Sequence, residues 1–463
     1  MEEIDKSIYF MVIAVAFIDG ALRIVNIPTF YLWKDYYHLS PGMNCLLRYI
    51  TKLPWCIKPV FAYISDRYYI AGYRTKIYFL ITGVLQAVCL LLLGTEIPSL
   101  ALSTCIIFVE QLNIAFRDTL AEGLMVVISR HEDKMKAQRA KGAVVQSSSQ
   151  KYVSAIYTLR FIGNLSSNYV AGILLQYYTP HQVMAFCSVL PALTFIQALF
   201  YFREKRDFNS AERETKFKAF TFKEIYTFME RKGLKAYLAF VLIMLLWPNT
   251  INGIRYFLID NLSFSTNDIG LIFTLSSLLY VLYMFFMNTF FKSYTLRSYY
   301  MMIIVMMLVD VLVRILMMVP DLYSIAFLIA LVDQSINNLF YDLPSIPLLS
   351  IICKSCPESK EATFYAFFVS VTNFFCSLAN LTGYLFLDLM DVTAQDYSNV
   401  NPVNLLCGIW AVMLWNFTYY LRFPDASIVK RRNVVKVDRT ATKVVKRTQT
   451  AEYSEPVSVG NSD

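Results

Sequence analysis

Charged residues are scarce in this sequence. They make up 16% of its 463 residues, whereas soluble domains carry about 25%. Hydrophobic residues make up 57% of the chain, and its mean hydropathy is +0.47. So little charge excludes an ordinary soluble protein, and we expect an integral membrane protein built only from α-helices.

Histidine and paired cysteine are also scarce. The chain has three histidines, and its nine cysteines fall mostly inside apolar runs, where cysteine behaves as a small hydrophobe. Cys353 and Cys356 form a Cys-x-x-Cys pair that lacks the second pair or the histidines a metal site needs. No Gly-rich phosphate loop or nucleophile–base constellation is present either. We therefore expect no metal, no cofactor and no enzymatic activity.

Long apolar segments are abundant. Twelve of them reach about 20 residues, enough to span a bilayer. They cover residues 8–32, 41–64, 75–94, 97–127, 150–175, 181–202, 234–258, 266–291, 297–318, 322–349, 361–387 and 402–422. Two sets of six spans resemble a transporter of the major facilitator type, in which two six-helix bundles rock about a midplane site.

The net charge of +8 is distributed by topology. Lysine and arginine gather in alternate loops and in the C-terminal tail, which indicates a membrane orientation and not a nucleic-acid surface. The basic loops predict that both termini are cytoplasmic. No organelle address is evident, so we expect the plasma membrane, with an internal organelle membrane as the alternative.

The spans divide the chain into four predicted parts. These are an N-terminal bundle (1–205), a cytoplasmic linker (206–233), a C-terminal bundle (234–423) and a tail (424–463). Thr221 and Glu224 form a capping box that predicts a short amphipathic helix in the linker. The tail is polar and basic, so we expect it to be disordered and to contact anionic lipid.

The loop after the second span carries a charge motif. ISDRYYIAGYRTK (64–76) resembles the loop signature of the major facilitator superfamily, an Asp-Arg followed by a glycine and basic residues. Asp66, Arg67 and Arg74 would form a latch that breaks when the two bundles rotate. The alternative is a plain cytoplasmic loop with one acid.

Several charges lie inside the spans, where each costs at least about 2.5 kcal/mol. Asp19 and Arg23 stand four residues apart, as do Asp310 and Arg314. Residues at this spacing share one helix face, so each pair can neutralise itself. We expect a structural role for both pairs.

The fourth span contains a stripe of like charges. Asp118 and Glu122 stand four residues apart, and Glu110 projects in a similar direction. Lys58 and Arg160 from neighbouring spans are the expected counter-ions. Two interpretations stay open: a buried network that holds the N-terminal half together, or a site for a ligand or a proton.

Five segments carry a resemblance to a known family. They are YLWKDYYHLSP (31–41), LPWCIKP (53–59), SDRYYIAGYR (65–74), AFRDTLAEGLMV (115–126) and PLLSIICKSCPESKEATFYAFFVSVTNF (347–374). Together they resemble the motifs of the folate-biopterin transporter family, a branch of the major facilitator superfamily. The similarity covers most of residues 15–390.

This resemblance implies alternating-access transport of pterins, folates or related metabolites, coupled to protons. Asp118 and Glu122 match the family's acidic pair, and Lys58 matches the lysine of its Pro-Trp-x-x-Lys-Pro motif. Arg160 precedes a glycine of the family pattern. The chain departs from that pattern at Arg117, where a small residue is usual, and at Glu122, where aspartate is usual.

A pterin fits these residues on chemical grounds as well. Its pyrimidine edge presents two adjacent N–H donors, which match a carboxylate of Asp118 or Glu122. Lys58, Arg160 or Arg255 could balance the glutamate tail of a folate, which biopterin lacks. Burial beside a like charge favours the protonated form of a carboxyl group, so Glu122, together with Asp118, is the predicted proton carrier.

Two other functions are compatible with the sequence. A transporter in this fold could carry another organic solute such as S-adenosylmethionine, with the acids binding a cationic cargo. A non-transporting receptor or scaffold is the alternative from another class, although the number of charges in the spans argues against it. The sequence does not define the oligomeric state.

Overall fold

The computed structural model describes residues 6–139, 149–206, 226–227, 229–230, 234–290, 295–355 and 361–421. In these ranges the regular elements are helices, and one isolated bridge joins Ile70 and Tyr73. The predicted linker helix at Thr221 and Glu224 and the tail 424–463 lie outside the described residues.

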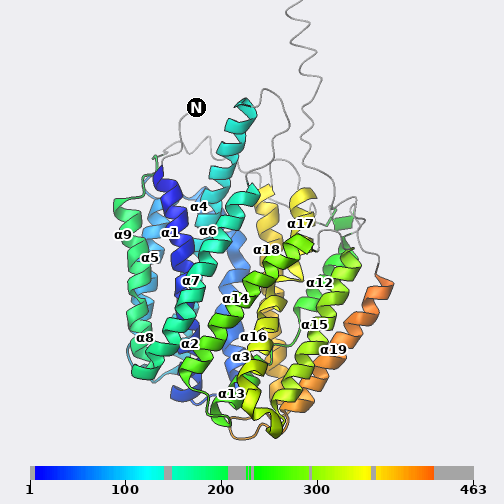
Figure 1. Cartoon of the computed structure of the whole chain (residues 1–463). Helices are drawn as coiled ribbons and strands as arrows, with labels where there is room; N and C mark the ends of the chain where they lie inside the picture. Colours follow the sequence, from blue (N-terminus) through cyan, green and yellow to red (C-terminus); the bar gives the residue numbers. More distant parts are fainter. Residues whose placement is uncertain are drawn as a thin grey trace, which may run out of the picture.

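Helices of residues 6–206 form one side of the molecule, here called the N-terminal half (Figure 1). They are α1 (Lys6–Ala21), η1 (Leu22–Val25), α2 (Asn26–Tyr31), η2 (Leu32–Tyr36), α3 (Pro41–Lys52), η3 (Leu53–Ile57), α4 (Lys58–Arg67), α5 (Lys76–Leu93), α6 (Leu100–Arg139), α7 (Ser149–Tyr177), α8 (Pro180–Cys187) and α9 (Val189–Phe200).

Helices of residues 234–421, the C-terminal half, form the other side. They are α12 (Lys235–Leu245), α13 (Ile251–Asp260), α14 (Thr266–Phe290), α15 (Leu296–Met317), η5 (Pro320–Ile325), α16 (Ala326–Asp342), α17 (Ser345–Ser355), α18 (Glu361–Leu389) and α19 (Val400–Tyr420). The predicted domain boundaries at 205 and 234 stay a prediction.

Nine helices in the described part of the chain are long and apolar enough to cross a membrane. The other three predicted spans are also helical, but they are interrupted or more polar: α3–η3–α4, α7 and α12–α13. Proline explains two of the interruptions, because it lacks an N–H donor. Pro54 lies in η3, and Pro248 lies between α12 and α13. The predicted count of twelve spans is therefore confirmed in part.

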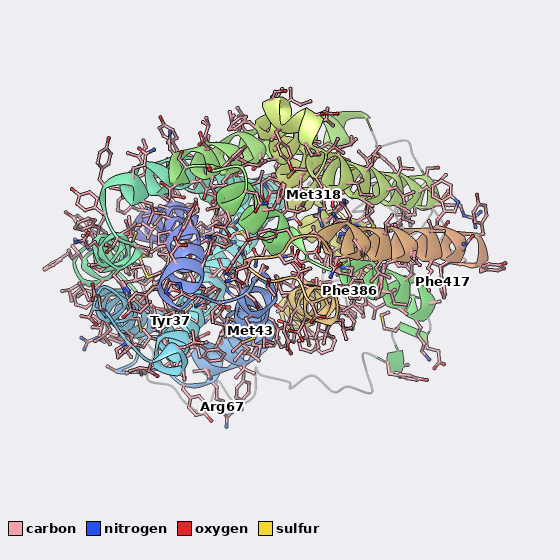
Figure 2. The ribbon with its side chains drawn as sticks, turned by 90° about the horizontal axis from the view of Figure 1, so that it is seen from below. Tyr37, Met43, Arg67, Met318, Phe386 and Phe417 are labelled. Atoms are coloured by element: carbon pink, nitrogen blue, oxygen red, sulfur yellow. The ribbon has the colours of Figure 1, made fainter. Side chains whose placement is uncertain are left out.

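The outer faces of the helices are apolar. Leu312 and Phe417 are 55% and 56% exposed, and Phe417 lies on the outside of the bundle (Figure 2). Many polar and charged side chains are instead buried between helices, among them Arg117, Asp118 and Arg314. Apolar residues outside and charges inside are the arrangement a lipid bilayer requires, so the chain is a multi-pass membrane protein.

Glycines let α1 and α7 cross at close range. A Cβ atom on Gly20 would overlap the backbone of Arg160, and one on Gly163 would overlap the backbone of Phe17. This close approach brings the side chain of Arg160 to the inner surface of the N-terminal half. Gly172 of α7 and Gly270 of α14 likewise bring the two halves together.

A second contact between the halves joins α3 and α18. Seen along the helices, Met43 of α3 and Phe386 of α18 lie beside the boundary between the halves (Figure 2). A Cβ atom on Gly42 would lie 3.4 Å from the Tyr384 ring, so the two helices touch directly. The most extensive contacts between the halves are therefore α7 with α14 and α3 with α18, and η3, α4 and α13 add to the second.

We predict that Gly163→Ala lowers the thermal stability of the purified protein. The added methyl group must displace the α1 backbone, and overpacking of this kind costs about 1–3 kcal/mol. Gly123→Ala is the matched control, because a Cβ atom there meets nothing within 4 Å. Equal melting temperatures for the two variants, measured in the same detergent, would show that the α1–α7 crossing tolerates a side chain.

Candidate functional site

The Asp118 cluster, made of Asp118, Glu122, Lys58 and Arg160, joins three helices of the N-terminal half. Lys58 Nζ donates to Asp118 Oδ2 at 2.6 Å, and Arg160 of α7 forms an ion pair with the other oxygen of Asp118. Lys58 Nζ also lies 3.1 Å from Glu122 Oε2. The predicted counter-ions are thus the observed ones, and two cations balance two carboxylates.

Local sequence places Lys58 in this cluster. Pro54 lies in the 3-10 turn η3, and α4 begins at Lys58 with Pro59 behind it. Lys58 is 4% exposed and lies over the Trp55 ring, with Nζ 5.4 Å from the ring centroid. The break between α3 and α4 therefore turns this lysine inward, where Asp118 meets it.

A second buried ion pair joins α1 to α6 and corrects an expectation. Arg117 is fully buried; its Nε donates to Asp19 Oδ1 at 2.8 Å and its Nη1 donates to Gln86 Oε1 at 2.6 Å. The expected pair of Asp19 with Arg23 is wrong. The chain winds more tightly in η1, which rotates Arg23 away from the α1 face that carries Asp19, and Arg23 is exposed.

Amide side chains extend this network from Arg117 to Glu110 and Lys52. Gln86 Nε2 donates to Glu110 Oε1 at 2.9 Å, and Gln111 Nε2 donates to Glu110 Oε2 at 2.8 Å. Gln111 Oε1 then accepts from Lys52 Nζ at 2.8 Å and from Trp55 Nε1 at 3.1 Å. Glu110 therefore takes its hydrogen bonds from amides and is not part of the Asp118 cluster.

A cavity of about 30 Å³, which we call the central cavity, opens beside Glu110. It has room for about two water molecules. Its wall is formed by aromatic rings and polar side chains of α2, η2, α3 and α6, including Phe30, Trp33, Asn44, Arg48, Lys52 and Glu110.

Helix geometry puts the inner end of the central cavity near the bilayer midplane, whereas Trp33 and Leu93 line it at the outer ends of their helices. With a rise of about 1.5 Å per residue, Lys52 lies about 16 Å from the start of α3 and Glu110 about 15 Å from the start of α6. A hydrocarbon layer about 30 Å thick has its midplane at that depth. Asp118 lies about 27 Å along α6, so the Asp118 cluster is nearer the end with the basic loops.

Arg48 and Lys52 fall inside the predicted span 41–64, but the sequence did not assign them to the site, and it placed Glu110 with Asp118 and Glu122. One signal was available. Arg48 and Lys52 are like charges four residues apart, as Asp118 and Glu122 are, and such a pair cannot neutralise itself. Their depth and their shared cavity could not be read from spacing.

Arg255 belongs to a different group of residues. Its Nη1 donates to Asn252 Oδ1 at 3.1 Å, its Nη2 donates to Gln334 Oε1 at 2.9 Å, and its guanidinium lies 4.7 Å from the centroid of the Phe273 ring. With Asp333 it lines a smaller cavity of the C-terminal half. The structure therefore places Arg255 apart from the Asp118 cluster.

The C-terminal half has its own buried ion pairs. Arg314 Nη2 lies 2.8 Å from Asp310 Oδ2, so the predicted pairing four residues apart is confirmed. Arg314 Nε also donates to Asp333 Oδ1 of α16 at 2.7 Å. The pair is thus extended to a neighbouring helix, which spacing alone did not reveal.

The loop between α4 and α5 is held by charge as well. Arg74 Nε donates to Asp66 Oδ1 at 3.0 Å, and Gly72 between them has a φ of 79°, which glycine adopts readily. Glu204 accepts from the backbone N–H of Lys76 at 2.7 Å and thereby caps α5. Arg67 lies at the edge of the molecule (Figure 2).

The opposite end of the molecule is sealed by contacts between the halves. Lys34 Nζ donates to Asp260 Oδ1 at 2.6 Å, and the Tyr397 hydroxyl donates to Asp260 Oδ2 at 2.6 Å. Beneath this contact, Asn252 Nδ2 donates to Asn44 Oδ1 at 3.1 Å. Lys34 and Asn44 come from the N-terminal half, so separating the halves at this end breaks these bonds.

Solved transporter structures share this arrangement of helices. The nucleoside transporter NupG is 13% identical and has a TM-score of 0.63, over 92% of this chain and 100% of that chain. A structure reported as "Structural insights into substrate recognition in proton dependent oligopeptide transporters" is 11% identical, with a TM-score of 0.61 over 89% and 98%. The fold is that of a major-facilitator-type membrane transporter.

Within that class, the chain belongs to the BT1 family, whose family model matches residues 19–443. Folate transporter 1 of Plasmodium falciparum (isolate 3D7) is 25% identical over 411 residues, which cover 88% of this chain and 78% of that protein. The folate-biopterin transporter of Synechocystis sp. is 23% identical over 428 residues, covering 90% and 82%. The resemblance drawn from sequence motifs is confirmed, and the chain is a transporter and not an enzyme.

We predict that Asp118→Asn destabilises the protein more than the double variant Asp118→Asn/Lys58→Met. The single change leaves two buried cations with one carboxylate, and an uncompensated buried charge costs about 3–5 kcal/mol. The double change restores the charge balance of the cluster. Melting temperatures in detergent measure both effects.

The control for this experiment is Glu96→Gln, which alters an exposed carboxylate in the loop before α6. A change at such a site stays within about 0.5 kcal/mol. If the single and double variants at the cluster melt at the same temperature, the charges of Asp118 and Lys58 are not coupled.

Proposed function

We propose that this chain moves folate- or pterin-type metabolites across its membrane by alternating access, driven by protons. The observation that carries the proposal is the central cavity, a polar chamber of the N-terminal half in a transporter fold. Transporters of this architecture bind their cargo near the midplane where the two bundles meet, and α3, which lines the cavity, packs against α18 of the other half. The names of the BT1 relatives supply the cargo class.

The chemistry of the central cavity suits such a cargo. Phe30 and Trp33 supply aromatic faces for stacking a flat ring. Asn44 and Glu110 supply acceptors that match the N–H donors of a pterin edge. The present volume is too small for a pterin, so the cargo enters a more open state of the same chamber.

Ion pairs at the two ends of the molecule support alternating access. The Lys34–Asp260 ion pair closes one end of the molecule, and the Asp66–Arg74 pair holds the loop at the other. In the outward-open state that we propose, the Lys34 pair breaks and the basic end closes. The roles of Asp66, Arg67 and Arg74 in this gating are part of the proposal.

Proton coupling is proposed at the Asp118 cluster. Glu122 is its most accessible member, with 34% of its side chain exposed, and Lys58 is its closest counter-ion. When rocking separates Glu122 from Lys58, the carboxylate loses its stabilising charge and takes up a proton. Asp118, Lys58 and Arg160 then exchange partners with the cargo as it passes. The binding role of Arg255 stays a prediction.

The membrane and the orientation are proposed from the loops. Basic residues border the Arg67 end, which we assign to the cytoplasm together with both termini. The plasma membrane is the proposed location, and an internal organelle membrane is the alternative that imaging of the tagged full chain would distinguish.

We predict saturable uptake of labelled folate or biopterin by cells that lack their own uptake and express this chain. Accumulation should rise at least several-fold with an inward proton gradient and fall when the gradient is collapsed. S-adenosylmethionine is tested in parallel, because it separates a cationic cargo from a pterin. Uptake of none of the pterins, by protein present at the cell surface, would overturn the proposal.

We also predict that Glu122→Gln loses gradient-driven accumulation but keeps exchange of internal for external substrate. The amide preserves the size of the side chain and removes the titrating group. The exposed Glu96→Gln change is the control for expression. Full gradient-driven accumulation by Glu122→Gln would remove Glu122 as the proton carrier.

A further inference from the structure

Arg48 differs from the other buried arginines of the helices. Arg117, Arg160 and Arg314 each pair with an aspartate, and Arg255 donates to amide oxygens. Arg48 is partly buried and lines the central cavity, yet its side chain makes no hydrogen bond or ion pair with another residue in the described ranges. Its guanidinium is therefore available to something that enters the cavity.

The depth of Arg48 in the membrane makes a guanidinium without a partner unusual. Arg48 lies about 10 Å along α3, inside the hydrocarbon layer. An arginine near the centre of a spanning helix costs at least about 2.5 kcal/mol. Asn44, Thr51 and Lys52 share the polar side of α3 with it, so the charge is directed at the protein interior and the cavity.

The charges around the central cavity do not balance. Among the residues that line it, Arg48 and Lys52 are basic, whereas Glu110 is the one acid. Lys52 donates to the neutral oxygen of Gln111, and Glu110 takes its hydrogen bonds from Gln86 and Gln111. An excess of one positive charge in a low-dielectric chamber favours a negatively charged guest.

We infer that Arg48 and Lys52 form a carboxylate-binding subsite of the central cavity, so that the preferred cargo is an aromatic compound with a carboxylate. The inference rests on the proposed function and narrows it: a folate with its glutamate tail fits, and an uncharged pterin such as biopterin leaves the cations unpaired.

The geometry of the chamber agrees with a ring joined to an acid. The guanidinium of Arg48 can hold a carboxylate through two parallel N–H···O bonds, and Lys52 adds a point charge one turn further along α3. Phe30 and Trp33, from α2 and η2, line the same cavity, and their rings suit an aromatic ring. A cationic cargo would meet two like charges there.

The test compares Arg48→Gln with Arg203→Gln in the purified full chain. Arg203 is an exposed arginine of the same half and does not line the central cavity, so its loss is the matched control. Folate and biopterin binding are measured by titration with labelled compound, and melting temperature is recorded for each variant.

We predict that the unaltered protein binds folate at least tenfold more tightly than biopterin. Arg48→Gln should lose tenfold or more in folate affinity, keep its biopterin affinity and melt no lower than the unaltered protein, because it removes an unpaired charge. Arg48→Lys should keep part of the folate affinity, and Arg203→Gln should change neither affinity.

Four results would overturn the inference. Equal affinity for folate and biopterin, or unchanged folate affinity in Arg48→Gln, rejects the subsite and leaves the proposed function standing. Lower melting temperature with equal losses for both compounds assigns Arg48 a structural role. Binding of neither compound by the folded, unaltered protein overturns the proposed function and the subsite with it.

Discussion

Ionised side chains that cannot face lipid fix the arrangement of the N-terminal half. The Asp19–Arg117 pair joins α1 to α6, and the Asp118 cluster joins α4, α6 and α7. Each pair is satisfied only at one rotation and one depth of its helices, whereas apolar packing tolerates several. The charges thereby specify how this bundle fits together, and the cavity at its centre depends on that fit.

The Asp118 cluster and the central cavity differ in their charge balance. The Asp118 cluster has equal numbers of cations and carboxylates, so it is stable without a ligand. The central cavity has one cation in excess, with Arg48 lacking a partner among the described residues. A network with balanced charges suits a structural role and can also move protons. A cavity with unbalanced charges suits the binding of a charged ligand that neutralises the excess.

Much of this organisation could be predicted from the sequence, because hydropathy, loop charge and four-residue spacing are local properties. They identified the spans, the Asp310–Arg314 pair and the counter-ions of Asp118. The partner of Asp19 could not be predicted, since it depends on the turn η1, which interrupts α-helical spacing. The central cavity was missed for a related reason: the common depth of Lys52 and Glu110 depends on where two separate helices begin.

The charges of α3 and α4 have a consequence for how the protein enters the membrane. This span is not among the nine described helices that are long and apolar enough to cross a membrane, and the carboxylate that receives Lys58 lies 60 residues later in the chain. At about 5–20 residues per second, the ribosome needs about 3–12 s to deliver it. We therefore expect the second span to stay at the insertion machinery until α6 has been synthesised. The helices of the N-terminal half would then enter the membrane together.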